Sequence, residues 1–243
     1  MKNQKSTAAI IVIGDEILSG RVKDENSPFL IKQLTKQGVN VQTCITIPDN
    51  ITAIANTIYD CHKKYKWVFT AGGIGPTHDD ITMEGIAKAF NANLIQNEEL
   101  VQLIKELYGK KFREEHLKMA IVPKGIKLLY SKKNRFPVLT FENIIIMPGV
   151  PEFLKAIYIS IKSLYQGEKI HSKMIKITLE EAEIATLLKD TIQKFPGLKI
   201  GSYPLFRKSA FSVKLILQHK NKEILTSGEM YLNEKLEDYI NEE

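Results

Sequence analysis

The run from Thr70 to Thr82, TAGGIGPTHDDIT, places glycines beside two adjacent carboxylates. Glycine lets backbone N–H groups approach an anion closely and tolerates positive φ angles. Asp79 and Asp80 in the same loop would repel a phosphate unless a divalent cation lay between them and the anion. The combination predicts metal-assisted chemistry on a phosphate ester or anhydride.

The flanking residues predict how this loop is held. The apolar run Trp67–Thr70 is typical of a buried strand, and the spacing of apolar residues in Ile81–Phe90 predicts a helix. A strand that delivers a glycine loop to a helix start has the geometry with which proteins hold phosphates. Asp80 could cap that helix, but one acid suffices for a cap, so the Asp79–Asp80 pair favours a functional role.

Acidic residues also follow the two earlier strands. A strand expected over residues 8–13 is followed by Gly14, Asp15 and Glu16, and one expected over residues 39–47 by Asp49. Ligands of open α/β sheets bind beyond the carboxyl ends of the strands, so we expect these acids to converge. Two alternatives stay open: Asp49 or its neighbour Asn50 caps the next helix, and Asp15 and Glu16 are solvated loop residues.

Two further features lie near the expected site. Pro148 and Gly149, in the turn PGVP, would expose N–H groups at a helix start and bind a second anion, or would form an ordinary strand-to-helix turn. His78, between Thr77 and Asp79, is a candidate base or metal ligand, or merely a loop residue.

The composition is compatible with an enzyme of this kind. The 243 residues are 44% hydrophobic, enough to bury a sizeable core, and the net charge of +6 suits an anionic substrate. The lysines are scattered among glutamates, which argues against nucleic acid as a partner. Cys44 and Cys61 lack zinc-site spacing and indicate a reduced, cytoplasmic setting. No apolar run is long enough to span a membrane, and signal-peptide features are absent.

The order of predicted elements gives the domains. Residues 1–166 alternate strand and helix patterns, which predicts an α/β, three-layer, doubly wound and mostly parallel sheet. Ser27 before Pro28 indicates a helix N-cap, and Gly38 a helix C-terminus. Residues 170–243 predict a small α+β domain with the order βαββα.

These residues together resemble the MoaB/Mog-type molybdopterin-binding fold family. The similarity lies in Gly72–Pro76, followed by Asp80 to Thr82, and in Asp49. In the adenylyltransferases of that family, the acids that match Asp49 and Asp80 are catalytic, and the glycine loop binds the pterin and its phosphate. An acid at Asp79 replaces a basic residue common in those enzymes, which argues against adenylylation and for stronger metal binding.

The chain is more similar to the CinA-like branch of the family. Gly14–Gly20, the doubled acid at Asp79 and Pro148–Glu152 all fit that branch. The resemblance is strongest to the N-terminal, FAD hydrolase-like domain of eukaryotic-type FAD synthases, through Thr70–Asp80 and Gly201–Pro204.

This resemblance implies a metal-dependent nucleotide pyrophosphatase that cleaves FAD, ADP-ribose or a similar dinucleotide to AMP and a phosphorylated product. Asp49, Asp79 and Asp80 are then expected to be catalytic and to hold Mg²⁺, Mn²⁺ or Co²⁺. The expected substrate-binding residues are Gly14, Asp15, Glu16, Gly72, Gly73, Gly75, Pro76, Thr77, Pro148 and Gly149.

Two alternatives remain at this point: a molybdopterin-binding or adenylylating protein, and a non-catalytic binding module. The resemblance further implies a homo-oligomer, a dimer, with a small nucleotide or pterin phosphate as its ligand.

Overall fold

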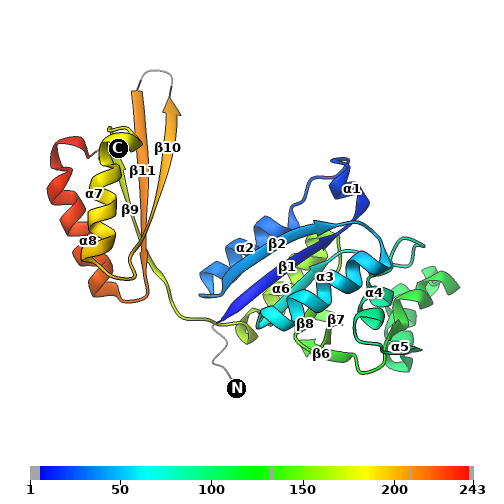
Figure 1. Ribbon diagram of the computed structural model, residues 1–243. Helices are drawn as coiled ribbons and strands as arrows, with labels where there is room; N and C mark the ends of the chain where they lie inside the picture. Colours follow the sequence, from blue (N-terminus) through cyan, green and yellow to red (C-terminus); the bar gives the residue numbers. More distant parts are fainter. Residues whose placement is uncertain (1–5, 132–133, 208–209, 241–243) are drawn as a thin grey trace. The chain divides into compact units, whose positions relative to one another are not determined.

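The chain divides into two compact units, Met1–Gly167 and Glu168–Glu243. The computed structural model, shown in Figure 1, describes residues 6–131, 134–207 and 210–240. The strands of the first unit are β1 (Thr7–Ile13), β2 (Asn40–Ile47), β3 (Trp67–Ala71), β4 (Leu94–Gln96), β5 (Ile121–Pro123), β6 (Lys127–Ser131), β7 (Asn134–Phe141) and β8 (Ile144–Met147). Its helices are α1 (Asp15–Leu18), α2 (Asn26–Lys36), α3 (Ile51–Lys64), α4 (Thr82–Ala89), α5 (Glu98–Tyr108) and α6 (Pro151–Ile161), with 3₁₀ turns η1 (Gly109–Lys111), η2 (Glu114–Ala120) and η3 (Lys162–Leu164).

The described residues of the first unit form a six-stranded sheet in the order β2-β1-β3-β8-β7-β6. The four strands from β2 to β8 are parallel, and β7 and β6 continue the sheet in antiparallel pairing. Every residue of β1 is buried, as expected of a strand covered on both faces. Its side chains alternate between two cores: Ile11 packs with residues of α3, α4 and α5, and Ile10 with residues of α2 and α6. The predicted three-layer, mostly parallel α/β fold is confirmed.

The chain order reverses at β1. The chain passes from β1 to β2 on one side and then to β3 on the other, so the loops after β1 and β3 diverge at a topological switch point. This is where open α/β sheets bind ligands. The loops that follow β1, β2, β3 and β8 begin at Gly14, Pro48, Gly72 and Pro148, and all leave the same edge of the sheet.

The helix ends differ from expectation at one place. Ser27 is not the N-cap of α2, since the helix begins at Asn26. Asp24 fills the capping role: its Oδ1 accepts hydrogen bonds from the amides of Asn26 and Ser27 at 2.9 and 3.0 Å. A carboxylate two residues before the helix competes well for these free N–H groups. Gly38 follows the helix with φ 76°, as its C-terminal position predicts.

The second unit has the predicted βαββα order. It contains β9 (His171–Ile177), α7 (Glu181–Lys194), β10 (Lys199–Arg207), β11 (Ala210–His219), α8 (Lys222–Lys235) and the 3₁₀ turn η4 (Glu237–Tyr239). The three strands form an antiparallel sheet in the order β10-β11-β9. Its core joins Ile177 and Leu215 of the sheet to Ile184 of α7 and Leu232 of α8. Among the described residues of both units, no helix has the length and apolar character needed to cross a bilayer.

Candidate functional site

A cavity of ≈ 880 Å³ opens at the carboxyl ends of the strands of the first unit. Its size lies within the range of small-molecule binding sites. Most of the residues expected to form the site line it: Gly14, Glu16, Asp49, Gly72, Gly73, Gly75, Pro76, Asp79, Asp80, Pro148 and Gly149. The other two expected residues support it from outside. The amide of Asp15 contacts Asp49, and Thr77 contacts Asp79 and Asp80.

In the loop after β2, one residue caps the helix and another lines the cavity. Asn50 is the N-cap of α3, and its Oδ1 accepts hydrogen bonds from the amides of Thr52 and Ala53, both at 3.0 Å. Asp49 is therefore not needed as a cap. Its Oδ2 accepts a hydrogen bond from the amide of Asp15 at 2.9 Å, which ties the loop after β2 to the loop after β1. Of the alternatives left open by the sequence, the structure assigns capping to Asn50.

The loop after β3 depends on two glycines. Gly72 has φ +112°, and a Cβ there would lie 2.2 Å from the carbonyl oxygen of Ile13. Gly73 has φ +67°, and its Cβ would lie 2.3 Å from Oγ1 of Thr82. Thr82 in turn bonds back to the loop, its Oγ1 donating to the Gly72 carbonyl at 2.9 Å and its amide to the Gly73 carbonyl at 3.0 Å. Any side chain at either glycine would disrupt this turn.

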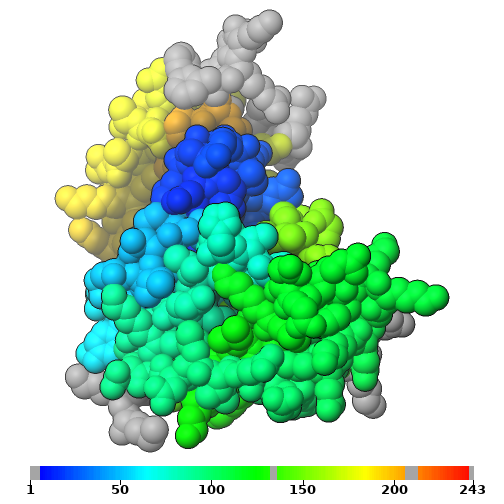
Figure 2. Space-filling view, turned by 90° about the vertical axis from the view of Figure 1, so that its right-hand side faces the viewer, coloured from blue at the N-terminus to red at the C-terminus, as the bar shows by residue number. Residues whose placement is uncertain are grey.

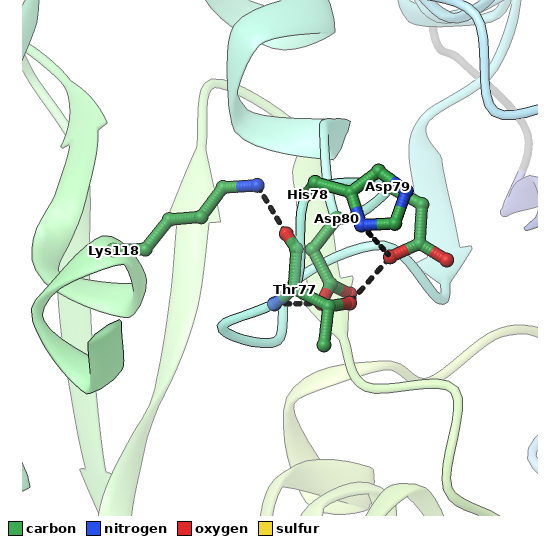
Figure 3. Close-up of polar contacts among 5 residues, drawn as sticks. All are labelled: Thr77, His78, Asp79, Asp80 and Lys118. Atoms are coloured by element: carbon green, nitrogen blue, oxygen red, sulfur yellow. Dashed lines mark hydrogen bonds and ion pairs between the residues drawn. The ribbon is translucent and has the colours of Figure 1, made fainter. Parts of the chain in front are cut away.

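Asp79 and Asp80 both contact the side chain of Thr77, as Figure 3 shows. Oδ2 of Asp80 accepts hydrogen bonds from the amide of Thr77 at 2.8 Å and from its hydroxyl at 2.7 Å. Oδ1 of Asp79 contacts the same hydroxyl. Asp80 does not cap α4, which has no side-chain cap. Lys118, from the distant turn η2, donates to the Thr77 carbonyl, and so fixes the loop from the opposite side.

His78 is the outermost residue of this group. Its Nδ1 lies 4.0 Å from Oδ1 of Asp79, and its side chain is 99% exposed. It does not line the cavity. This position favours the interpretation of His78 as a loop residue.

The carboxylates influence one another. Burial raises the pKa of Asp49, and the negative charges of Asp15, Glu16 and Asp79 raise it further, although the hydrogen bond from the Asp15 amide opposes the shift. The pKa of Asp79 is lowered, chiefly by the hydrogen bond from Thr77, with the positive charges of His78 and Lys118 contributing. Asp49 and Asp79 come from loops 30 positions apart in the chain, yet they lie in one electrostatic environment.

The turn after β8 lies against the glycine loop. The amide of Gly72 donates to the Met147 carbonyl at 3.1 Å, and a Cβ on Gly149 would lie 3.4 Å from the Cα of Gly72. Asn26 fixes the turn through its Nδ2, which donates to the Gly149 carbonyl at 2.6 Å. The N-terminus of α6, which begins at Pro151, therefore lies beside the glycine loop, where its free amides favour an anion.

The carboxylates suit a cation that is shared with a ligand. Within the described part of the chain, no three His, Cys, Asp or Glu side chains gather closely enough to hold a metal ion by themselves. Catalytic Mg²⁺ is commonly held by one or two carboxylates together with substrate phosphates and water. Asp79 and Asp80, joined through Thr77, match this incomplete donor set, and Asp49 lines the same cavity.

Sequence reasoning missed the apolar part of the cavity. It is formed by side chains of α5, η2, β7 and α6, including Leu107, Tyr108, Met119, Phe136 and Phe153. Figure 2 shows the face of the first unit on which the residues of α5 and η2, in green, are prominent. One signal was available: α6 buries the stripe Leu154, Tyr158 and Ile161, whereas the large apolar side chain of Phe153 lies outside that stripe.

Fold and cavity thus define an open α/β protein with a switch-point site suited to a phosphate-bearing ligand. A family model described as a probable molybdopterin binding domain matches residues 9–164. A model described as the middle domain of FAD synthase matches residues 169–243. The chain belongs to the molybdopterin-binding domain family, in its CinA-like branch.

Known relatives agree with this assignment. A protein of Archaeoglobus fulgidus is 34% identical over 195 residues, which cover 80% of this chain and 84% of that one. A probable FAD synthase of Caenorhabditis briggsae is 32% identical over 98% of this chain, which spans 51% of that relative. The chain therefore spans about half the length of the FAD synthases it matches. The crystal structure of the protein CinA from Thermoplasma acidophilum aligns with a TM-score of 0.60 and 30% identity, covering 66% of this chain and 98% of that one.

Proposed function

We propose that this protein is a metal-dependent nucleotide pyrophosphatase that splits the diphosphate of FAD, ADP-ribose or a similar dinucleotide into AMP and a second phosphate ester. One observation carries the proposal: Asp49, Asp79 and Asp80 line the same cavity as the glycine turn at Gly72 and Gly73. The family and the FAD synthase relatives support a ligand that is a nucleotide or a pterin.

The chain's own groups would bind and orient the diphosphate. Gly73 and Gly75 line the cavity without side chains, so a phosphate could approach their backbone closely. The adjacent N-terminus of α6 adds amides without intrahelical partners. In phosphoryl transfer most of the acceleration comes from such positioning and electrostatic stabilisation, so a preformed cradle is a substantial part of catalysis.

Asp79 and Asp80 would hold the divalent cation, which leaves Asp49 for another role. When bound, Mg²⁺, Mn²⁺ or Co²⁺ would neutralise phosphate charge and polarise the phosphorus for attack. The hydrogen bond from Thr77 lowers the pKa of Asp79, which favours the ionised carboxylate that a cation needs. Lys118 and Thr77 hold the loop in the conformation that presents both acids.

Asp49 would receive the proton of the attacking water. Its Oδ2 is occupied by the Asp15 amide, which leaves Oδ1 free to accept a proton. The raised pKa makes this carboxylate a stronger base than an ordinary aspartate. The water oxygen bonds to one phosphorus, the bridging P–O bond breaks, and the bridging oxygen leaves on the other phosphate.

The test is a substrate panel with Mg²⁺, Mn²⁺ and Co²⁺ that measures AMP and its partner product. Wild-type protein should release both in equal amounts, and Asp80→Ala should lower the rate by about 10²-fold or more, as for the loss of one preorganised stabilising group. Asp60→Ala, on the exposed side of α3, is the matched acidic control. Undiminished cleavage by folded Asp80→Ala protein would refute the assignment.

A second candidate is a molybdopterin-binding or adenylylating protein, favoured by the family match over residues 9–164. It predicts ATP-dependent consumption of molybdopterin and no release of FMN from FAD.

The same preparations also test the proposed homodimer by light scattering.

A further inference from the structure

The strand order separates the two kinds of residue that line the cavity. The acidic lining residues follow β1, β2 and β3: Glu16, Asp49 and the Asp79–Asp80 pair. The apolar lining comes mainly from β8 and β7 and from helices that pack beside them. Because the sheet order is β2-β1-β3-β8-β7, the acids lie toward one end of the cavity and the apolar residues toward the other.

Part of the apolar end is exposed to solvent. Phe153 is 63% exposed, Leu107 52% and Val150 47%, although all three line the cavity. The residues contributed to the lining by α5, η2, β7 and α6 include no charged side chain among those that the structure describes. Exposed apolar residues that line a cavity are typical of a ligand-binding surface.

One aromatic side chain at this end, that of Tyr108, is held by a neighbouring ring. The ring of Tyr108 stacks on His116 with centroids 3.8 Å apart and an interplanar angle of 20°. Phe153 lies in the first turn of α6, directly after the turn that contacts the glycine loop. A ring bound against Phe153 would therefore be joined to a phosphate at the glycine loop by a short linker.

The geometry points to Phe153, with Tyr108 and Phe136, as a specificity-determining surface for the part of the substrate beyond the AMP moiety, an inference that rests on the proposed diphosphate cleavage. This surface would favour a broad ring system with a hydrocarbon edge over a bare sugar. A flavin has such an edge and a broad aromatic face, whereas a ribose has no aromatic face to stack on these rings. The stacking contact is therefore available to FAD and not to the terminal ribose of ADP-ribose, so the surface discriminates between the two.

FAD and ADP-ribose share the ADP portion, so comparing them isolates this surface. With Mg²⁺ present, wild-type protein should have the higher kcat/KM for FAD. In Phe153→Ala, kcat/KM for FAD should fall about tenfold more than kcat/KM for ADP-ribose, the scale of one lost aromatic stacking contact. Phe153→Trp should retain the preference. Ile159→Ala, an exposed apolar change elsewhere on α6, should leave both values unchanged.

A binding measurement separates this inference from the proposed reaction. FMN is titrated into the full chain by quenching of flavin fluorescence, with ribose 5-phosphate as competitor. Phe153→Ala should weaken FMN binding about tenfold. If dinucleotides are not cleaved but FMN binding depends on Phe153, the reaction is wrong and the surface stands. If cleavage occurs but Phe153→Ala affects both substrates equally, or neither, and FMN binding is unchanged, the surface is refuted and the reaction stands.

Discussion

In the loop after β2, one residue caps the helix and its neighbour, a carboxylate, lines the cavity. In the loop after β3, two neighbouring carboxylates both bond within the loop and neither caps the helix. Asn50 caps α3 and leaves Asp49 for the cavity. Asp79 and Asp80 instead share the Thr77 hydroxyl, and α4 begins without a side-chain cap. The two loops use similar residue types, but only after β2 does one polar residue cap the helix while its neighbour lines the cavity.

The loops also differ in backbone. The loop after β2, Pro48–Asn50, contains no glycine, and Asn50 keeps an extended conformation. The loop after β3 needs the positive φ angles of Gly72 and Gly73 to turn into the cavity. In this loop the conformation that lines the cavity is also the conformation that the fold requires. Substitutions should therefore separate activity from stability after β2, whereas substitutions of the two glycines after β3 should couple them.

The largest effect is expected at Asp49. Asp49→Asn retains an oxygen for the Asp15 amide but loses the negative charge, so kcat/KM for the dinucleotide should fall about 10²-fold. The free energy of unfolding should change by no more than about 0.5 kcal/mol, since the loop remains bonded. Rate and chemical denaturation are measured on the same preparation. Full activity in Asp49→Asn would show that the Asp49 carboxylate has no catalytic role, so that the loop after β2 would not separate activity from stability.

Gly73→Ala should lower both the stability and the activity of the protein. The new Cβ meets the fully buried Thr82 at φ +67°, so we expect a loss of about 2 kcal/mol in the free energy of unfolding, together with a loss of activity. Gly20→Ala is the matched control, because Gly20 has φ +70° but no atom within 4 Å of its Cβ. It should lose only about 1 kcal/mol, the cost of the backbone conformation alone. Equal losses at the two positions would show that contact with Thr82 is unimportant.

Asn50→Ala should affect stability alone. Two amides of α3 lose their acceptor, which costs about 1 kcal/mol in the free energy of unfolding. kcat/KM should stay close to the wild-type value, since Asp49 keeps its bond to the Asp15 amide. Asn50→Asp retains the cap and should restore stability. A large loss of activity in folded Asn50→Ala protein would mean that capping and catalysis are coupled after β2 as well.

The smallest effect is a change in pH dependence. Asp49 acts as a carboxylate, so kcat/KM should fall as the pH drops through its pKa, which lies above the ordinary 3.8 because of burial and of the charges of Asp15, Glu16 and Asp79. Asp15→Asn removes one of those charges and keeps the backbone amide, so the acidic limb should move to lower pH. Asp60→Asn serves as the control. If the acidic limb of the pH profile stays in place in Asp15→Asn, or moves to higher pH, the result would contradict the role assigned to Asp49.

Much of the local structure was predictable from the sequence. The apolar spacing predicted a helix over residues 98–108, which is α5, and a strand over residues 67–70 of β3. Buried strands and amphipathic helices carry their own periodic signals, and these are independent of distant contacts. The short strands β4 and β5 were not predicted, because three residues are too few for a pattern. The sequence also led to the wrong capping residue for α2, Ser27 instead of Asp24, because both residue types suit that role.

The sequence alone determined that acids follow the first three strands and that glycines precede the last acidic pair, because strand ends and turn residues are local properties. Only the tertiary structure decided which of Asp49 and Asn50 caps the helix, that Lys118 fixes the acidic loop, and that Phe153 and Tyr108 complete the cavity. Those outcomes depend on strand order and on contacts between segments far apart in the chain. No periodicity within a single segment encodes such contacts.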